Sequence, residues 1–170
     1  PTSSTTATLA LGDALAVCLL TARDFSSEDF AKYHPGGALG KQLYLKVSDI
    51  FPHHELPKIQ ENASIEEVIM EISSKRLGAT AVVNNNNQLV GIITDGDLRR
   101  MIFEKKNSLN LEARDIMSKF PKTIDSEAYA VEALSVLREN NITQIIVEDK
   151  EKQKVVGFIH LHDLLKEGII

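Results

Sequence analysis

Apolar and polar positions in the middle of the chain follow the periods of a helix and of two strands. Ser64 and Glu67 have the spacing of a capping box, so we expect a helix to begin there. The apolar residues that follow recur at helical spacing, and they are Ile65, Val68, Ile69 and Ile72. Ala79–Val83 and Leu89–Thr94 predict two strands around a polar, asparagine-rich hairpin turn. A helix over Asp97–Glu104 is predicted to complete this unit.

A second unit with the same order of elements follows. The pattern predicts a helix near Ala128–Glu139, strands over Gln144–Val147 and Val155–His160, and a helix over His162–Glu167. Each unit is therefore expected to run strand, helix, strand, strand, helix, and the predicted fold class is α+β.

The residues of the two units also repeat. Gly91–Leu98 returns as Gly157–Leu164 about 66 residues later, and Ser48–Phe51 returns as Arg114–Met117 at the same offset. Two copies of a unit this long usually pack against each other around a shared cleft. We therefore expect a paired ligand-binding module from about Val47 onward.

The first forty residues have a different pattern. Thr6–Ala22 is rich in alanine and leucine and is apolar on more than one face, which predicts a helix meant to be buried. A short helix over Ser26–Tyr33 and a turn at residues 34–40 are expected next, with a domain boundary around Leu43–Lys46. The chain begins at Pro1 with no initiator methionine and no signal-peptide pattern, so we expect that a preceding segment is missing.

Composition excludes some classes of partner. The chain of 170 residues carries a net charge of −5, which argues against a nucleic-acid partner because phosphate backbones require a basic surface. The longest apolar run, Ala14–Leu20, is too short to cross a membrane. Cys18 is the only cysteine, so no disulfide can form within the chain. We expect a cytoplasmic protein with neither nucleic-acid nor membrane partners.

Thr94 and Asp97 occupy positions suited to a phosphorylated sugar. Thr94 lies between a strand and a helix, where its hydroxyl and the first helical N–H groups can meet a phosphate. Asp97 can accept hydrogen bonds from two ribose hydroxyls. The alternative is that Thr94 or Asp95 only caps the helix. In the second unit His160 stands in place of Thr94 while Asp163 is retained, which predicts either one working half-site or an unusual ligand.

With these motifs the two units resemble CBS domains, and the pair resembles a Bateman module, which binds adenosyl or other nucleotide-type ligands. Residues 1–43, with Gly12–Ala16 and the turn His34–Gly40, resemble the C-terminal helices of the α/β sugar-isomerase (SIS) domain of D-arabinose-5-phosphate isomerases. The resemblance implies one CBS domain at 47–106 and a second at 113–170. Enzymes of this family interconvert ribulose 5-phosphate and arabinose 5-phosphate, the first step toward the lipopolysaccharide sugar Kdo.

The resemblance also implies residue roles. His34 lies in the family's His-Pro-Gly-Gly turn and is expected to be catalytic, because aldose–ketose isomerisation needs a base that titrates near neutrality. The residues expected to bind an effector are Thr94, Asp97, Asp115, Asn62, His160 and Asp163. No cofactor is expected to be required. The expected effector, acting by feedback, is CMP-Kdo, AMP or ATP, and the substrate is a sugar phosphate. A homo-oligomer, a tetramer in the parent protein, is expected, and the chain alone is expected to be inactive.

Two alternatives remain at the level of sequence. The chain is also compatible with a free-standing CBS module that senses nucleotides for an unrelated activity, although such a module has no need of the first forty residues. The histidine pairs His53–His54 and His160 with His162 suggest a metal, but no acidic partner lies at a ligand spacing, so no metal site is expected.

Overall fold

The computed structural model describes residues 2–26, 29–30, 33, 41, 43–51, 55–104 and 111–169. It divides into two compact parts, an N-terminal part (Pro1–Leu43) and a C-terminal part (Tyr44–Ile170). The turn that contains His34 lies outside the described residues.

The N-terminal part contains one long helix, α1 (Ser3–Ala22), which has apolar residues all round and none of them buried. Leu9 is 67% exposed and Val17 is 61% exposed. Helix α1 is long and apolar enough to cross a membrane by length and composition alone, a test that core helices of soluble proteins also pass. The expectation of no membrane partner rested on the shorter run at residues 14–20, which covers only part of this helix.

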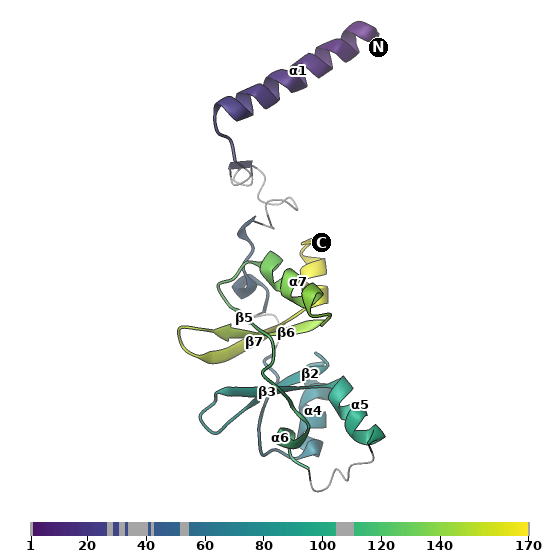
Figure 1. Ribbon diagram of the computed structural model, residues 1–170, viewed down its shortest axis with the longest axis vertical. Helices are drawn as coiled ribbons and strands as arrows, with labels where there is room; N and C mark the ends of the chain where they lie inside the picture. Colours follow the sequence, from purple (N-terminus) through teal and green to yellow (C-terminus); the bar gives the residue numbers. More distant parts are fainter. Residues whose placement is uncertain are drawn as a thin grey trace. The chain divides into compact units, whose positions relative to one another are not determined.

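The C-terminal part holds both repeats, and each contains the predicted order of strand, helix, strand, strand and helix, which two elements that were not predicted precede in the second repeat (Figure 1). The elements of the first repeat are β1 (Lys58–Gln60), α4 (Ile65–Lys75), β2 (Ala79–Val83), β3 (Leu89–Thr94) and α5 (Asp95–Phe103). The elements of the second repeat are α6 (Ala113–Ile116), β4 (Ser118–Lys119), β5 (Thr123–Asp125), α7 (Ala130–Glu139), β6 (Gln144–Asp149), β7 (Lys154–His160) and α8 (Leu161–Lys166). The capping box of Ser64 and Glu67 forms at the start of α4, as predicted.

Each repeat forms one small sheet. The sheet orders are β1-β2-β3-β4 and β5-β6-β7. In each sheet the first strand pairs parallel with the second, and the second and third strands form an antiparallel hairpin. Figure 1 shows the sheets facing each other, with α7 outside one and α4, α5 and α6 outside the other.

The two sheets share a hydrophobic core where they meet. Leu77, Ala79 and Ala81 of the first repeat cluster with Ile146 and Phe158 of the second. All five side chains are less than one-tenth exposed. Because small alanines on β2 oppose the large Phe158 on β7, the sheets approach closely and the repeats form one folding unit.

The segment that enters the first repeat packs in the core of the second. This first leading segment (residues 45–51) includes the short helix η1 (Val47–Asp49) and contributes Val47 and Ile50 to the second repeat's hydrophobic core. The amide of Val47 donates to the carbonyl of Ala128 at 2.9 Å. Phe51 lies against Gly157, where a Cβ would come within 2.3 Å of the ring.

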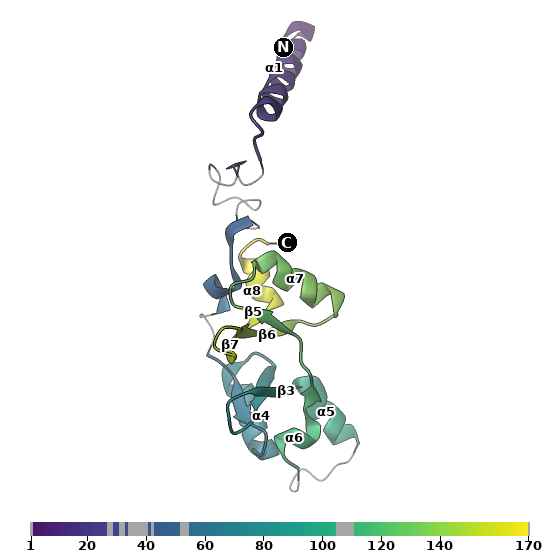
Figure 2. The same cartoon turned by 60° about the vertical axis from the view of Figure 1, so that its left-hand side comes forward.

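The second leading segment (residues 112–119) makes the reciprocal exchange. Ala113 is buried in the core of the first repeat, and its amide donates to the carbonyl of Ala63 at 2.9 Å. Met117 lies against Gly91, which occupies the same position in β3 as Gly157 in β7. Strand β4, in the same segment, adds to the edge of the first sheet. Each repeat is therefore completed by a segment that precedes the other one (Figure 2).

Candidate functional site

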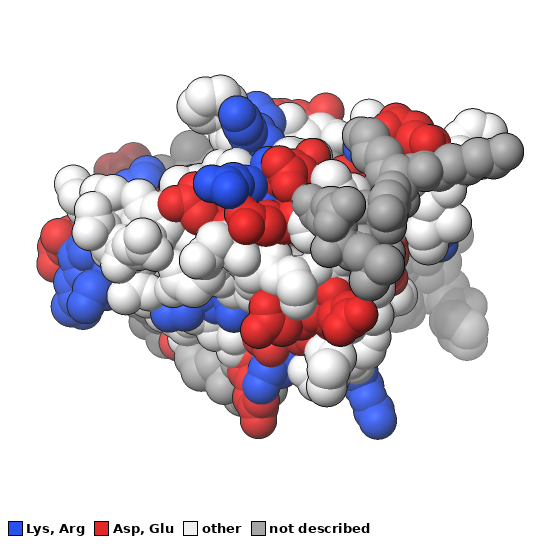
Figure 3. Space-filling view, turned by 90° about the horizontal axis from the view of Figure 1, so that it is seen from below, with Lys and Arg blue, Asp and Glu red and all other residues white. Residues whose placement is uncertain are grey.

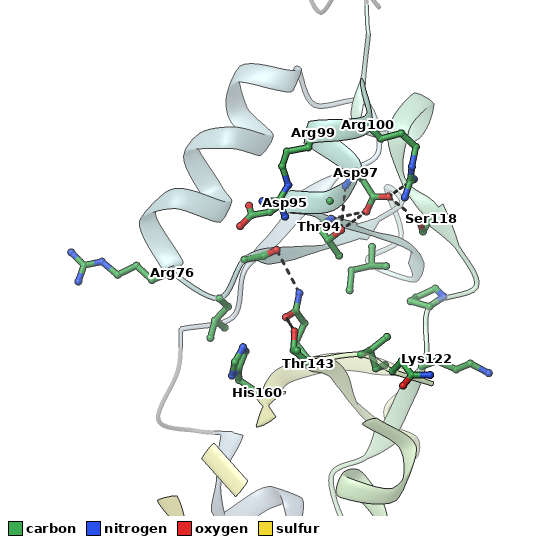
Figure 4. A pocket seen from close by; sticks show the side chains of 18 residues that line it. Arg76, Thr94, Asp95, Asp97, Arg99, Arg100, Ser118, Lys122, Thr143 and His160 are labelled. Carbon is green, nitrogen blue, oxygen red and sulfur yellow. Dashed lines mark hydrogen bonds and ion pairs between the residues drawn. The ribbon is translucent and has the colours of Figure 1, made fainter. Parts of the chain in front are cut away.

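A cavity of about 760 Å³ lies between the two repeats, at the end where β3 leads into α5 and β7 leads into α8. Its volume is within the range of small-molecule sites. Figure 4 shows Thr94, Asp97, Arg100 and Ser118 on the first-repeat side, with Thr143 and His160 on the opposite side. The cavity is therefore the shared cleft that the repeat predicted.

Thr94 and Asp97 form a reciprocal cap at the start of α5. The Thr94 amide and hydroxyl donate to Oδ2 of Asp97 at 2.9 and 2.7 Å, and the Asp97 amide donates to the Thr94 hydroxyl at 3.3 Å. The capping alternative is thus realised, with Thr94 rather than Asp95 as the cap. Both residues also line the cavity, so capping and contact with a ligand are compatible.

The second carboxylate oxygen of Asp97 also has two donors. Arg100 donates to Oδ1 at 2.9 Å, and the hydroxyl of Ser118 donates to the same oxygen at 3.3 Å. Asp97 is only 5% exposed, and these bonds compensate for burying its charge. A carboxylate has about four lone-pair sites, and all are used here. A ribose hydroxyl must therefore replace an existing donor, and the bond from Ser118 is the longest.

His160 and Asp163 repeat this arrangement in the second repeat with altered chemistry. The His160 amide donates to Oδ2 of Asp163 at 3.0 Å, and Nδ1 of His160 accepts from the His162 amide at 3.1 Å. An imidazole replaces the Thr94 hydroxyl as the capping acceptor, which leaves the proton of the neutral ring on Nε2. His160 lines the cavity, whereas Asp163 is buried behind the helix start and does not line it.

Charged groups in the cavity are mainly cationic. The lining includes the four cations Arg76, Arg99, Arg100 and Lys122 and the two acids Asp95 and Asp97. In Figure 4, Arg76 and Lys122 extend outward at opposite sides, whereas Arg99 and Arg100 lie over the turn from Thr94 to Asp97. A local excess of positive charge in a chain of net charge −5 favours an anionic ligand.

Besides Asp163, the structure leaves two more of the predicted effector residues outside this cavity. Asn62 lines a separate surface pocket of about 720 Å³ between β1 and α4. Asp115 is exposed and accepts from the Glu112 amide at 2.9 Å at the start of α6. Arg76 and Asn141 were not predicted from the sequence, and both line the cavity in left-handed conformations at φ 57° and 52°. Their signal is their equivalent place, at the C-terminal ends of α4 and α7.

The remaining charged groups bear on other candidate functions. On the face shown in Figure 3, acidic and basic side chains intermix and form no continuous basic surface over the described residues. Among the described residues, no group of three His, Cys, Asp or Glu side chains is arranged to hold a metal ion. His53 and His54 lie outside the described residues. Away from the cavity, the hydrogen bond from Lys46 to Glu127 raises the Lys46 pKa and ties the first leading segment to the second repeat.

Comparison with known proteins identifies the family. The CBS domain model matches residues 47–104 and 113–169, and the chain belongs to the CBS domain family. Over 171 residues it is 43% identical to the arabinose 5-phosphate isomerase KdsD of Escherichia coli K12, covering 100% of this chain and 52% of that protein. It is also 45% identical to an uncharacterised protein of Helicobacter pylori strain J99, covering 99% of this chain and 51% of that protein.

The chain thus spans about half the length of the curated relatives it matches. Among solved structures, it resembles a CBS domain protein from Pyrobaculum aerophilum complexed with AMP. The TM-score is 0.64 at 21% identity, over 71% of this chain and 90% of that one. At this identity the likeness supports the fold, a tandem CBS pair of α+β class.

Proposed function

We propose that the chain is the regulatory CBS pair of an arabinose-5-phosphate isomerase and that it binds a nucleotide-type effector in the cavity between its repeats. The observation that carries the proposal is the meeting of Thr94, Asp97 and His160 at one cationic cavity. The similarity to KdsD extends over the whole chain, including the residues before the CBS pair.

The cavity offers a distinct contact for each part of a nucleotide. Arg99 and Arg100, close to the start of α5, suit a phosphate group. A ribose hydroxyl takes the place of Ser118 at Oδ1 of Asp97, so that the buried carboxylate keeps all its hydrogen bonds. The proposed effectors are CMP-Kdo, AMP and ATP, and the bound AMP of the Pyrobaculum aerophilum protein supports a ligand of this class.

The catalytic half of the proposal rests on residues 1–43. The proposed reaction interconverts ribulose 5-phosphate and arabinose 5-phosphate, with His34 as a base. The exposed apolar surface of α1 supports its assignment as a core helix of a sugar-isomerase domain. The proposed setting is the cytoplasm, and the proposed assembly is a tetramer of the whole protein. An effector then regulates the enzyme through unequal affinity for two states of that assembly.

Binding is tested by calorimetric and thermal-shift titration of this chain with AMP, ATP, CMP-Kdo and arabinose 5-phosphate. We expect saturable stabilisation by a nucleotide and none by the sugar phosphate. Asp97→Ala also removes a buried cap, so Arg99→Gln is the better variant for weakening binding without unfolding. If none of the nucleotides binds, the effector proposal is wrong.

Activity is tested on the whole protein that contains this chain. We expect arabinose 5-phosphate to be converted to ribulose 5-phosphate, His34→Gln to reduce kcat strongly, and the effector to change the rate. An unchanged rate across a wide range of every nucleotide would contradict regulation while leaving the isomerase assignment intact. Absence of isomerase activity in the whole protein would favour the free-standing sensor.

A further inference from the structure

The two walls of the cavity carry different chemistry although they derive from equivalent positions. On the first-repeat wall, the turn after α4 and the first turns of α5 supply Arg76, Asp95, Arg99 and Arg100. The second-repeat wall is lined by Asn141, Ile142, Thr143, Gln144 and His160. Lys122, which directly precedes β5, is the one Lys, Arg, Asp or Glu among the described lining residues of the second repeat, and it extends outward in Figure 4.

The difference arises from substitution on a common backbone. Arg76 follows α4, Asn141 follows α7, and both have the left-handed conformation. Thr94 and His160 each cap the helix that follows the hairpin. The backbone therefore presents both walls alike, while the first wall carries three arginines and two acids and the second carries amide, hydroxyl and imidazole groups with one outward-facing lysine.

The two walls are close enough to be reached by one ligand. The side-chain amide of Gln144 approaches the backbone carbonyl of Gly78 on the opposite wall at 3.5 Å. Thr143 donates to the same Gln144 side chain at 2.8 Å, which orients that amide across the cavity. The two half-sites thus open into one volume rather than into two separate pockets.

We propose that a single ligand spans the cavity, with its phosphate on the first-repeat wall at Arg99 and Arg100 and its uncharged base on the second-repeat wall at Asn141 and Thr143. This inference rests on the proposed nucleotide binding and adds the orientation and a stoichiometry of one ligand per chain. An anionic group gains most from the guanidinium groups. The ring nitrogens and exocyclic groups of a base are matched by uncharged donors and acceptors, which lose less hydration on binding.

The test compares ligands that lack either the phosphate or the base, and it combines them with variants that remove one side-chain group from either wall. The probes are AMP, adenosine and ribose 5-phosphate, with CMP and cytidine as a second series, titrated by calorimetry. Arg99→Gln removes a charge from the first wall. Asn141→Gly removes the amide from the second wall and keeps the left-handed backbone, which glycine adopts without strain.

Matched controls are available outside the cavity. Arg138→Gln removes an exposed guanidinium from the last turn of α7, away from the lining residues. Asn87→Gly replaces an exposed asparagine that has nearly the same conformation, at φ 58°, in the hairpin of the first repeat. Neither control is expected to change any affinity.

We expect Arg99→Gln to weaken AMP and ribose 5-phosphate by roughly tenfold or more and to leave adenosine unchanged. Asn141→Gly is expected to weaken AMP and adenosine by roughly threefold to tenfold and to leave ribose 5-phosphate unchanged. The reverse pairing, equal effects on every probe, or two ligands per chain would overturn the orientation while nucleotide binding stands. If no probe binds the unmodified chain, both proposals fail together.

Discussion

Replacing Gly157 by alanine tests the close contact between the first leading segment and β7. The added Cβ lies 2.3 Å from Cδ2, 2.8 Å from Cγ and 3.0 Å from Cβ of Phe51. Carbon atoms pack best at about 3.5–4.0 Å, so the ring must move by more than about 1 Å. The backbone that precedes Phe51 resists this movement, because the Val47 and Ser48 amides are hydrogen-bonded to the second repeat at 2.9 Å.

The cost of the Gly157→Ala substitution can be bounded in two ways. If Phe51 stays, forcing a methyl group into a packed contact costs about 1–3 kcal/mol. If the half-buried ring leaves, losing about half of a typical aromatic burial costs about 2–3 kcal/mol. Replacing glycine also lowers the conformational entropy of the unfolded chain, which offsets about 0.4–1 kcal/mol of this loss. The expected net loss in the free energy of unfolding is about 1–2 kcal/mol.

Urea unfolding followed by circular dichroism measures this loss, and a double-mutant cycle assigns it to the contact. Phe51→Ala removes Cδ2 and Cγ, the two atoms nearest the new methyl, so the double variant should recover about 1 kcal/mol relative to additivity. Gly12→Ala, where a new Cβ has no neighbour within 4 Å, strengthens only helix α1 and should leave the unfolding of residues 44–170 unchanged. Strict additivity, or an unchanged stability of Gly157→Ala, would refute the reasoning.

Three further predictions concern the caps and one surface ion pair. Asp97→Asn replaces two acceptor positions with a donor and should cost about 1–3 kcal/mol in urea unfolding; a cost below about 0.5 kcal/mol would contradict the hydrogen bonds assigned to Oδ1 and Oδ2. Ser64→Ala should cost about 1 kcal/mol in the same assay, because α4 loses its side-chain acceptor, and Ser64→Thr should cost less. The hydrogen bond from Lys152 lowers the Asp149 pKa from 3.8, so its contribution to stability is present above that value and is lost as the pH falls through the lower folded-state pKa. Stability measured between about pH 2 and 5 should therefore decline less steeply in Asp149→Asn, and identical acid limbs would argue against the pair.

The spacing of apolar and polar residues predicted the helices and strands because interactions between residues close in the sequence determine where they form. The bounds predicted for β2 and β3 are those observed, since β-branched runs and a polar turn specify a hairpin without distant help. Helix α5 begins two residues earlier than predicted. Thr94 accepts the hydrogen bond of the first turn, and this choice between Thr94 and Asp95 depends on backbone geometry that spacing alone does not specify.

The candidate site was predicted only where the repeat itself marked it. Thr94, Asp97 and His160 were identified because they occupy matching motif positions. Arg76 and Asn141 have no motif, and they reach the cavity only because two left-handed residues turn the chain at the same place in each repeat. The assignment of Asn62 followed its place in the chain, and the fold puts it between β1 and α4 instead.

The exchange of leading segments also constrains how such a duplicated protein can be divided. A polypeptide with a single repeat would contain one sheet and one leading segment, but that segment packs in the core of the other repeat. In two such polypeptides, the leading segment of each would pack in the core of the other, which gives a domain-swapped dimer with twofold symmetry. In the present chain the two repeats are joined covalently, so the exchange of segments takes place within one molecule. A cut in the connection between residues 104 and 111 would leave two pieces that still hold each other.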